Sequence, residues 1–174
     1  MQQALSAFGR IDVLVNNVGG TIWMKPFHLY APEEIELELE RSLLPTLWCC
    51  RAVLPTMMQQ ESGSIVNLGS QSVRGLYRLP YATSKGGILA IGKVLSMEYG
   101  RYGIRVNTVS PGGTTIPDRV TPRLSLRPGV MAEDLPQEEA DAYRREMSED
   151  IQNQKSLNRR GTPEDQAAAV AFLA

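Results

Sequence analysis

A tyrosine and a lysine stand four residues apart in PYATSKGG, residues 80–87, where a helix is expected to begin. At this spacing Tyr81 and Lys85 project from one face of a helix. An ammonium group near a phenol stabilises the phenolate and lowers the tyrosine pKa from about 10 toward neutrality. Such a phenol can exchange a proton with a substrate hydroxyl near physiological pH. By itself the pair is a weak signal, because a tyrosine at a helix start is often an ordinary packed aromatic.

The elements that must position this pair alternate along the chain. Apolar, β-branched runs predict strands, and segments with helical start signals or apolar stripes predict helices. The strands are expected at residues 11–17, 63–70 and 104–110, and the helices at 31–58 and 81–102. Pro45 is expected to kink the first helix or divide it into two abutting helices. This order is typical of an α/β fold, with a parallel sheet covered by helices on both faces.

Each expected strand ends in a distinctive polar string: NNVGG, NLGSQS or SPGGTT. In parallel α/β sheets, ligands bind at the carboxyl ends of the strands, so these strings should converge on one cleft. Ser70 closes the second strand, eleven residues before Tyr81. Its hydroxyl can hold the same substrate oxygen as the tyrosine.

The segment 111–136 holds five of the eleven prolines and predicts a long loop. Loops of this length are usually lids or disordered, and we expect this one to close over substrate. A polar helix is expected over 137–157. A last helix is expected from Thr162, which would cap it ahead of Pro163.

Composition bounds the class of protein. With 174 residues, 43% hydrophobic, 21% charged and a net charge of −1, the chain predicts one soluble domain without affinity for nucleic acid. No secretory signal or bilayer-length apolar run is expected to direct it to a membrane. The adjacent Cys49 and Cys50 predict reduced thiols in the cytoplasm. His28 is the single histidine, so no metal site is expected.

Four motifs in order resemble the short-chain dehydrogenase/reductase family over essentially the whole chain. They are NNVGG after a strand, a serine closing the next strand, YATSK, and a strand followed by SPGG. The resemblance implies a Rossmann-like doubly wound sheet in a single domain, residues 1–174, and hydride exchange between a substrate carbon and a nicotinamide. Tyr81 would be the general acid/base, Lys85 would tune it and bind the nicotinamide ribose, and Ser70, in preference to Ser72, would orient the substrate.

The resemblance also implies a set of cofactor contacts. These residues are Asn16, Gly19, Tyr81, Lys85, Pro111, Gly112 and Thr114, with Thr115 as the alternative to Thr114. The side chain of Asn16 could instead bond a neighbouring strand. Gly112 and Gly113 could instead simply form a tight turn.

Longer segments, including RSLLPTLWCCRAVLP and RGLYRLPYATSKGG, resemble the benzoate cis-diol (1,6-dihydroxycyclohexa-2,4-diene-1-carboxylate) dehydrogenases. That resemblance implies NAD-dependent oxidation of a cyclic cis-diol carboxylate to a keto acid, which loses carbon dioxide to give catechol. A guanidinium suits a carboxylate, and Arg78, rather than Arg74, is the preferred candidate, although it could equally be a solvated loop arginine. The alternatives are another NAD(P)-dependent alcohol dehydrogenase or carbonyl reductase, or an inactive piece that only associates with intact subunits. Family members commonly associate through the helices expected at 32–58 and 81–102, which implies a homo-oligomer for the full-length protein.

Two departures from the family pattern carry further expectations. Ser42 stands where the family usually has a catalytic asparagine on the helix before the serine strand. No glycine-rich turn for the cofactor pyrophosphate occurs in the sequence. We therefore expect an incomplete sheet that lacks its first strands and its last strand. Because family members normally distinguish NAD from NADP after the second strand, this chain does not indicate which of the two is bound. Exposed edges at 11–17 and 104–110 would make the chain alone unstable and a poor binder of NAD.

Overall fold

The computed structural model describes residues 1–115, 136–153 and 159–174. Helices and strands alternate through the first part of the chain, and two helices follow. In chain order they are α1 (Gln2–Phe8), β1 (Val13–Asn16), η1 (Phe27–Leu29), α2 (Pro32–Ser42), α3 (Leu44–Gln60), β2 (Gly63–Leu68), η2 (Gln71–Arg74), α4 (Leu79–Tyr99), η3 (Gly100–Tyr102), β3 (Ile104–Val109), α5 (Gln137–Asn153) and α6 (Pro163–Leu173). Within the described residues no helix is long and apolar enough to cross a membrane.

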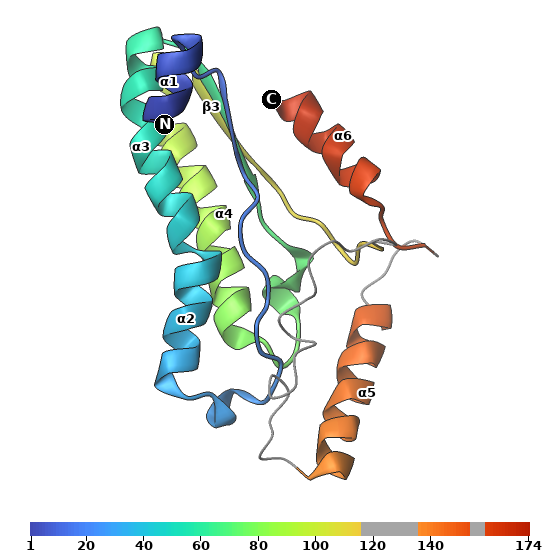
Figure 1. The fold of residues 1–174 in the computed structure, drawn as a ribbon. Coiled ribbons are helices and arrows are strands. Elements are labelled where there is room, and N and C mark those ends of the chain that lie inside the picture. Colours follow the sequence, from blue (N-terminus) through green and yellow to red (C-terminus); the bar gives the residue numbers. More distant parts are fainter. Residues whose placement is uncertain (116–135, 154–158) are drawn as a thin grey trace.

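The three strands form one parallel sheet in the order β1-β2-β3. Successive side chains of a strand point to opposite faces, so neighbours on β2 identify the two layers. Ile65 packs with α3, whereas the hydroxyl of Ser64 donates to the carbonyl of Leu173 at the end of α6, 2.7 Å away. Helices α3 and α4 therefore cover one face and α6 the other, as Figure 1 shows. The predicted α/β architecture is confirmed.

The predicted bounds of the first strand were too wide. We expected 11–17, and β1 covers Val13–Asn16. The amide of Ile11 donates to the side-chain oxygen of Gln60 at 3.0 Å, and the amide nitrogen of that side chain donates to the Ile11 carbonyl at 2.8 Å. A side chain at the end of α3 thus takes the hydrogen bonds that a neighbouring strand would otherwise make.

The long helical segment is divided near Pro45, as predicted. Helix α2 ends at Ser42, and α3 begins at Leu44 with the proline in its first turn. Amides in a first turn have no partner within the helix, so the missing N–H of proline costs nothing there. The two helices abut at Leu43.

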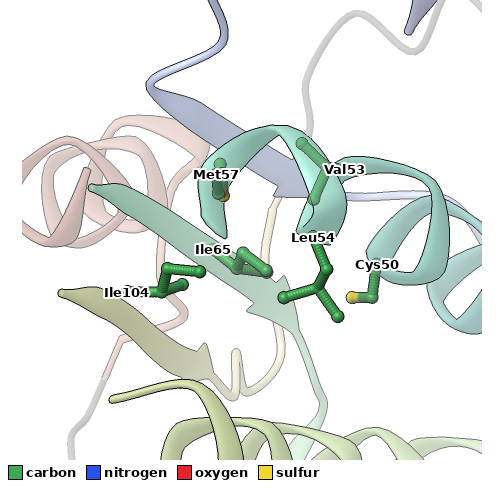
Figure 2. Close-up of a cluster of buried hydrophobic side chains, with 6 residues drawn as sticks. All are labelled: Cys50, Val53, Leu54, Met57, Ile65 and Ile104. Carbon is green, nitrogen blue, oxygen red and sulfur yellow. The ribbon is translucent and has the colours of Figure 1, made fainter. Parts of the chain in front are cut away.

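The hydrophobic core lies between α3 and the sheet (Figure 2). Its buried members are Cys50, Val53, Leu54, Met57, Ile65 and Ile104. Four come from α3 and one each from β2 and β3. This cluster holds α3 across the strands whose carboxyl ends carry the polar strings.

Helix α4 approaches the sheet closely because of one glycine. A Cβ added at Gly92 would lie 2.5 Å from the Oγ1 of Thr108 on β3, closer than a packed side chain tolerates. The helix begins at Leu79, two residues earlier than expected. The end of the range expected for it, 100–102, forms the separate 3-10 helix η3. This close packing fixes the helix that carries Tyr81 and Lys85.

The second half of the chain follows the prediction where the structure describes it. The polar helix α5 ends at Asn153, and the remainder of the range expected for it begins at residue 154, outside the described residues. Thr162 caps α6, accepting a hydrogen bond from the Asp165 amide at 3.2 Å. Of the proline-rich loop expected at 111–136, residues 116–135 lie outside the described part of the chain.

The first strand has a poorly covered face. Val13 and Val15 are 39% and 43% exposed, whereas Asn16, on the other face, is buried. Helix α6 contacts β2 and β3. The sheet therefore presents apolar side chains and an edge at β1, as expected for a partial Rossmann-like sheet.

Candidate functional site

The carboxyl ends of β2 and β3 are joined beyond the strands themselves. The amide of Gly69 donates to the carbonyl of Val109 at 2.8 Å, and the amide of Gln71 donates to the carbonyl of Pro111 at 2.9 Å. A Cβ on Gly69 would lie 2.6 Å from the hydroxyl of Ser110, so glycine is required for this approach. The strand ends predicted to meet, after β2 and after β3, are therefore held side by side.

Lys85 reaches this edge of the sheet from α4. Its side chain is almost fully buried, and Nζ donates to the carbonyl of Leu68, the last residue of β2, at 2.7 Å. The same nitrogen lies 5.8 Å from the centroid of the Tyr81 ring. Burial lowers the pKa of Lys85 because the charged form loses hydration. The structure thus brings the predicted tyrosine–lysine pair together at the end of the central strand.

Ser70 lies in the same region, two residues beyond the carbonyl that Lys85 contacts. It is buried, and its Oγ accepts a hydrogen bond from the amide of Ser72 at 3.0 Å, which caps η2. A hydroxyl has one proton to donate and two lone pairs, so this bond leaves capacity for a substrate oxygen. Ser72 contributes its backbone amide to this arrangement.

Arg78, the predicted carboxylate ligand, immediately precedes α4. Its guanidinium packs against Gly75, where an added Cβ would lie 2.7 Å from Nε. Arg78 and Gly75 both belong to the segment that runs from Ser70 to Tyr81. The candidate substrate-binding arginine is therefore in the loop that links the two candidate catalytic residues.

Asn16 makes the hydrogen bond to a neighbouring strand that the sequence analysis gave as one of its two possible roles. Its side-chain nitrogen donates to the Oδ1 of Asn67 on β2 at 2.8 Å and to the sulfur of Cys50 at 3.3 Å. Asn67 is fully buried and pairs directly with Asn16 in the strand register. Burial raises the pKa of Cys50 to about 11, so this thiol remains protonated at neutral pH. Asn16 therefore acts as a bridge between β1, β2 and α3.

Gly19 lies in the loop after β1 with a φ of 121°, a conformation that residues with a side chain rarely adopt. A Cβ there would also lie 3.1 Å from the Cα of Ser42. The hydroxyl of Ser42 accepts a hydrogen bond from the Gly20 amide at 3.3 Å and donates to Oε1 of Glu38 at 3.2 Å. Ser42, at the position where the sequence resemblance implies an asparagine, therefore contacts the loop after β1.

The turn after β3 is fixed by the segment that precedes α6. The amide of Gly161 donates to the carbonyl of Gly113 at 3.0 Å, and the amide of Thr115 donates to the carbonyl of Gly161 at 2.9 Å. The hydroxyl of Thr114 donates to the carbonyl of Gly112 at 3.3 Å. The turn that the sequence predicts is present, with Pro111 at its start.

Sequence reasoning missed a connection between the loop after β1 and the segment before α4. Tyr77 adopts a φ of 59°, and its carbonyl accepts hydrogen bonds from the Lys25 amide at 2.7 Å and the Tyr30 hydroxyl at 3.3 Å. The Tyr30 hydroxyl also lies 2.9 Å from the carbonyl of Trp23. Nothing in the sequence signals a left-handed backbone at a tyrosine. This connection ties two of the three loops that border the site.

Tyr77 also contacts α5. Its ring lies 4.9 Å from the ring of Tyr143, centroid to centroid, and its hydroxyl donates to the carboxylate of Glu146. Helix α5 follows the proline-rich segment and is thereby held against the loop that leads into Tyr81.

Comparison with known proteins identifies the class. The family described as short chain dehydrogenase matches residues 1–123, so the chain belongs to that family. Membership implies NAD or NADP as cofactor, and the family predicted from the sequence motifs is confirmed.

Curated relatives include two proteins with the same name. Over 174 residues the chain is 44% identical to the 1,6-dihydroxycyclohexa-2,4-diene-1-carboxylate dehydrogenase of Acinetobacter baylyi and 42% identical to that of Pseudomonas putida. All of the chain is aligned in both comparisons, which cover 64% and 61% of the relatives. The chain therefore spans less than two thirds of their length.

Solved structures show the same relation. A short-chain dehydrogenase/reductase from Burkholderia xenovorans superposes with a TM-score of 0.76 at 28% identity, over 99% of this chain and 60% of that one. A structure described as ElxO with NADP bound gives a TM-score of 0.76 at 27% identity, over 99% and 63%. The three-stranded sheet is thus part of the family's Rossmann fold.

Proposed function

We propose that this chain is the catalytic part of an NAD-dependent dehydrogenase that oxidises a cyclic cis-diol carboxylate of the 1,6-dihydroxycyclohexa-2,4-diene-1-carboxylate type. The observation that carries the chemistry is the buried ammonium of Lys85, 2.7 Å from the Leu68 carbonyl and 5.8 Å from the Tyr81 ring. The substrate class is supported by the two relatives at 44% and 42% identity.

The residues around the strand ends fit a nicotinamide cofactor. A Cβ on Gly20, after β1, or on Gly113, after β3, would meet no atom of the described residues within 4 Å, so among those residues there is open space beside both loops. Lys85 supplies a donor for a ribose hydroxyl. When bound, the nicotinamide accepts the hydride from the substrate carbon. In this proposal Gly19, Pro111, Gly112 and Thr114 line the cofactor, with Thr115 as the alternative to Thr114, and Asn16 acts by holding β1 in place.

The protein's own part in the reaction is proton transfer and orientation. The phenolate of Tyr81 removes the proton from the substrate hydroxyl as the hydride leaves the carbon. The ammonium of Lys85 stabilises that phenolate electrostatically, and the buried setting strengthens the effect. The hydroxyl of Ser70 holds the substrate oxygen, and Arg78 grips the ring carboxylate with its planar guanidinium. The keto acid then loses carbon dioxide to yield catechol, because rearomatisation drives that step.

The decisive test is Tyr81→Phe in the full-length gene product, with Tyr102→Phe beyond the far end of α4 as the matched control. Removing the acid/base group should reduce kcat by about 10²–10⁴-fold, since general acid–base catalysis contributes that much. The measurement is the appearance of NADH with the cis-diol carboxylate. Undiminished hydride transfer by Tyr81→Phe would refute the proposal.

A second candidate is another NAD(P)-dependent activity of the same family, such as reduction of a ketone. It is favoured by the structural similarity to a protein solved with NADP bound. Assays of the full-length gene product with the cis-diol carboxylate and with a ketoester, each with both cofactors, would separate the two. A preference for the ketoester with NADPH would replace the proposal above.

Two features of the chain support its association with a second copy. A groove of about 540 Å³ runs between α3 and α4, lined by apolar residues that include Leu54, Ile91 and Val94. Trp48 and Met97 on the same helices are 61% and 85% exposed. Two such faces related by a twofold axis would cover one another. Sedimentation of the full-length gene product as a monomer would contradict this assembly.

The proline-rich segment completes the proposal. We place the substrate lid at residues 111–136, between the turn after β3 and α5. Deletion of 117–130 should raise KM for the diol or lower turnover. Unchanged kinetic constants would contradict a lid.

A further inference from the structure

A glutamate outside the proposed catalytic set is completely buried. Glu38 lies on α2 with no exposed surface. Its Oε2 accepts a hydrogen bond from the Ile22 amide at 2.8 Å, and its Oε1 accepts one from the Ser42 hydroxyl at 3.2 Å. Burial raises the pKa of Glu38, whereas these bonds stabilise its ionised form. Burying a carboxyl group is costly, so its partners must offset the lost hydration.

One of those partners, the Ile22 amide, belongs to the loop that follows β1, and the other, Ser42 on α2, is itself bound to that loop. Ser42 donates to Glu38 and at the same time accepts from the Gly20 amide at 3.3 Å. The carboxylate therefore holds two amides of this loop, that of Ile22 directly and that of Gly20 through the serine. Ile22 is itself 2% exposed, so its amide has no access to solvent if this bond is lost.

The loop held in this way borders both sides of the proposed site. At one end Gly19, a proposed cofactor contact, packs against Ser42. At the other end the carbonyl of Trp23 and the amide of Lys25 are bound by Tyr30 and by the carbonyl of Tyr77, in the segment before α4. A displacement of the loop would therefore reach the cofactor side and the substrate side together.

We propose that Glu38 is a positioning residue, which fixes the loop Gly19–Lys25 at the amides of Ile22 and Gly20 and so holds the cofactor-contacting backbone in place. This role rests on the dehydrogenase function proposed above. Glu38 acts through the backbone of the loop and through Ser42, and it touches neither substrate nor cofactor.

The test compares Glu38→Ala, Glu38→Gln and Ser42→Ala in the full-length gene product, with Glu40→Ala on the exposed side of the same helix as control. Two quantities are measured: hydrogen exchange of the Gly20 and Ile22 amides, and the kinetic constants for cofactor and diol. Loss of a hydrogen bond to a buried amide should accelerate its exchange about tenfold or more. In Glu38→Ala both amides should exchange faster, and KM for NAD should rise about tenfold while kcat changes less.

The other variants separate positioning from a general loss of stability. Glutamine keeps an oxygen for Ile22 and a polar contact for Ser42, so Glu38→Gln should restore most of the protection and most of the affinity for NAD. Ser42→Ala should release the Gly20 amide and leave that of Ile22 protected. The proposal is overturned if exchange at both amides is unchanged in Glu38→Ala. It is equally overturned if exchange rises uniformly through β2 and Glu38→Gln gives no rescue.

Failure of the proposed function gives a different pattern. If the wild-type protein oxidises no diol with either cofactor, the kinetic measurements contradict the proposed dehydrogenase function. The exchange of the two amides still decides whether Glu38 holds the loop.

Discussion

Replacing Lys85 by methionine tests the electrostatic basis of the site. Methionine is unbranched and apolar, so it can occupy the buried channel that now holds the lysine stem. The change removes one positive charge 5.8 Å from the centroid of the Tyr81 ring and one hydrogen bond to the Leu68 carbonyl. The tyrosine itself stays in place on the first turn of α4.

The size of the effect follows from that distance. If the ring centroid is taken as the mean position of the delocalised phenolate charge, a unit charge 5.8 Å away stabilises the phenolate by about 3 kcal/mol at an effective dielectric constant of about 20. One pH unit corresponds to about 1.4 kcal/mol, so the loss amounts to about two pH units. Because the phenolate is the form that lost its stabilising charge, the rise of kcat/KM with pH should move about two units toward alkaline pH. At neutral pH the rate should fall roughly a hundredfold.

The assay is the pH dependence of kcat/KM for diol oxidation by the full-length gene product. Lys93→Met provides the control, because Lys93 is an exposed lysine two turns further along the same helix. Circular dichroism should show the same helix content for both variants. A Lys85→Met profile that coincides with the wild-type profile, at an unchanged rate, would refute the view that this ammonium activates the tyrosine.

Three further substitutions test the packing that positions the site, each by chemical denaturation of the full-length gene product. Gly92→Ala should lower the free energy of unfolding by about 2 kcal/mol, because the new methyl group meets Thr108. Adding Thr108→Ala should recover part of this loss. If the losses of the two single variants simply add in the double variant, the close approach of α4 to β3 is contradicted. Thr162→Ala should cost about 1 kcal/mol through the lost cap of α6, and an unchanged midpoint would show that the cap contributes nothing. Ile65→Val should cost about 1 kcal/mol, since Ile65 is completely buried, and a neutral result would place it outside the core.

Local signals in the sequence were sufficient for much of the fold. Pro45 marked the junction of α2 and α3, and Thr162 with Pro163 marked the start of α6, because capping and the missing proline N–H act within a few residues. The spacing of Tyr81 and Lys85 placed both on one face of α4, and the structure brings the ammonium near the ring. These features depend on short stretches of chain that the sequence presents directly.

Features set by distant contacts were not predictable in the same way. The early bound of β1 was wrong because Gln60, far along the chain, binds the backbone of Ile11. Asn67 was not singled out, since its role depends on strand register with Asn16. For Glu38 the sequence shows only that it lies four residues before Ser42, so that both side chains project from one face of their helix. The sequence alone could not show which loop it would meet.

Helix α4 has two working faces. One presents Lys85 to the end of β2, and the other lines the apolar groove with residues such as Ala90 and Val94. A second subunit that packs in that groove would restrict the movement of α4, the helix that carries Tyr81 and Lys85. Specific activity should then fall on dilution, as separated protomers leave this helix supported from one side only.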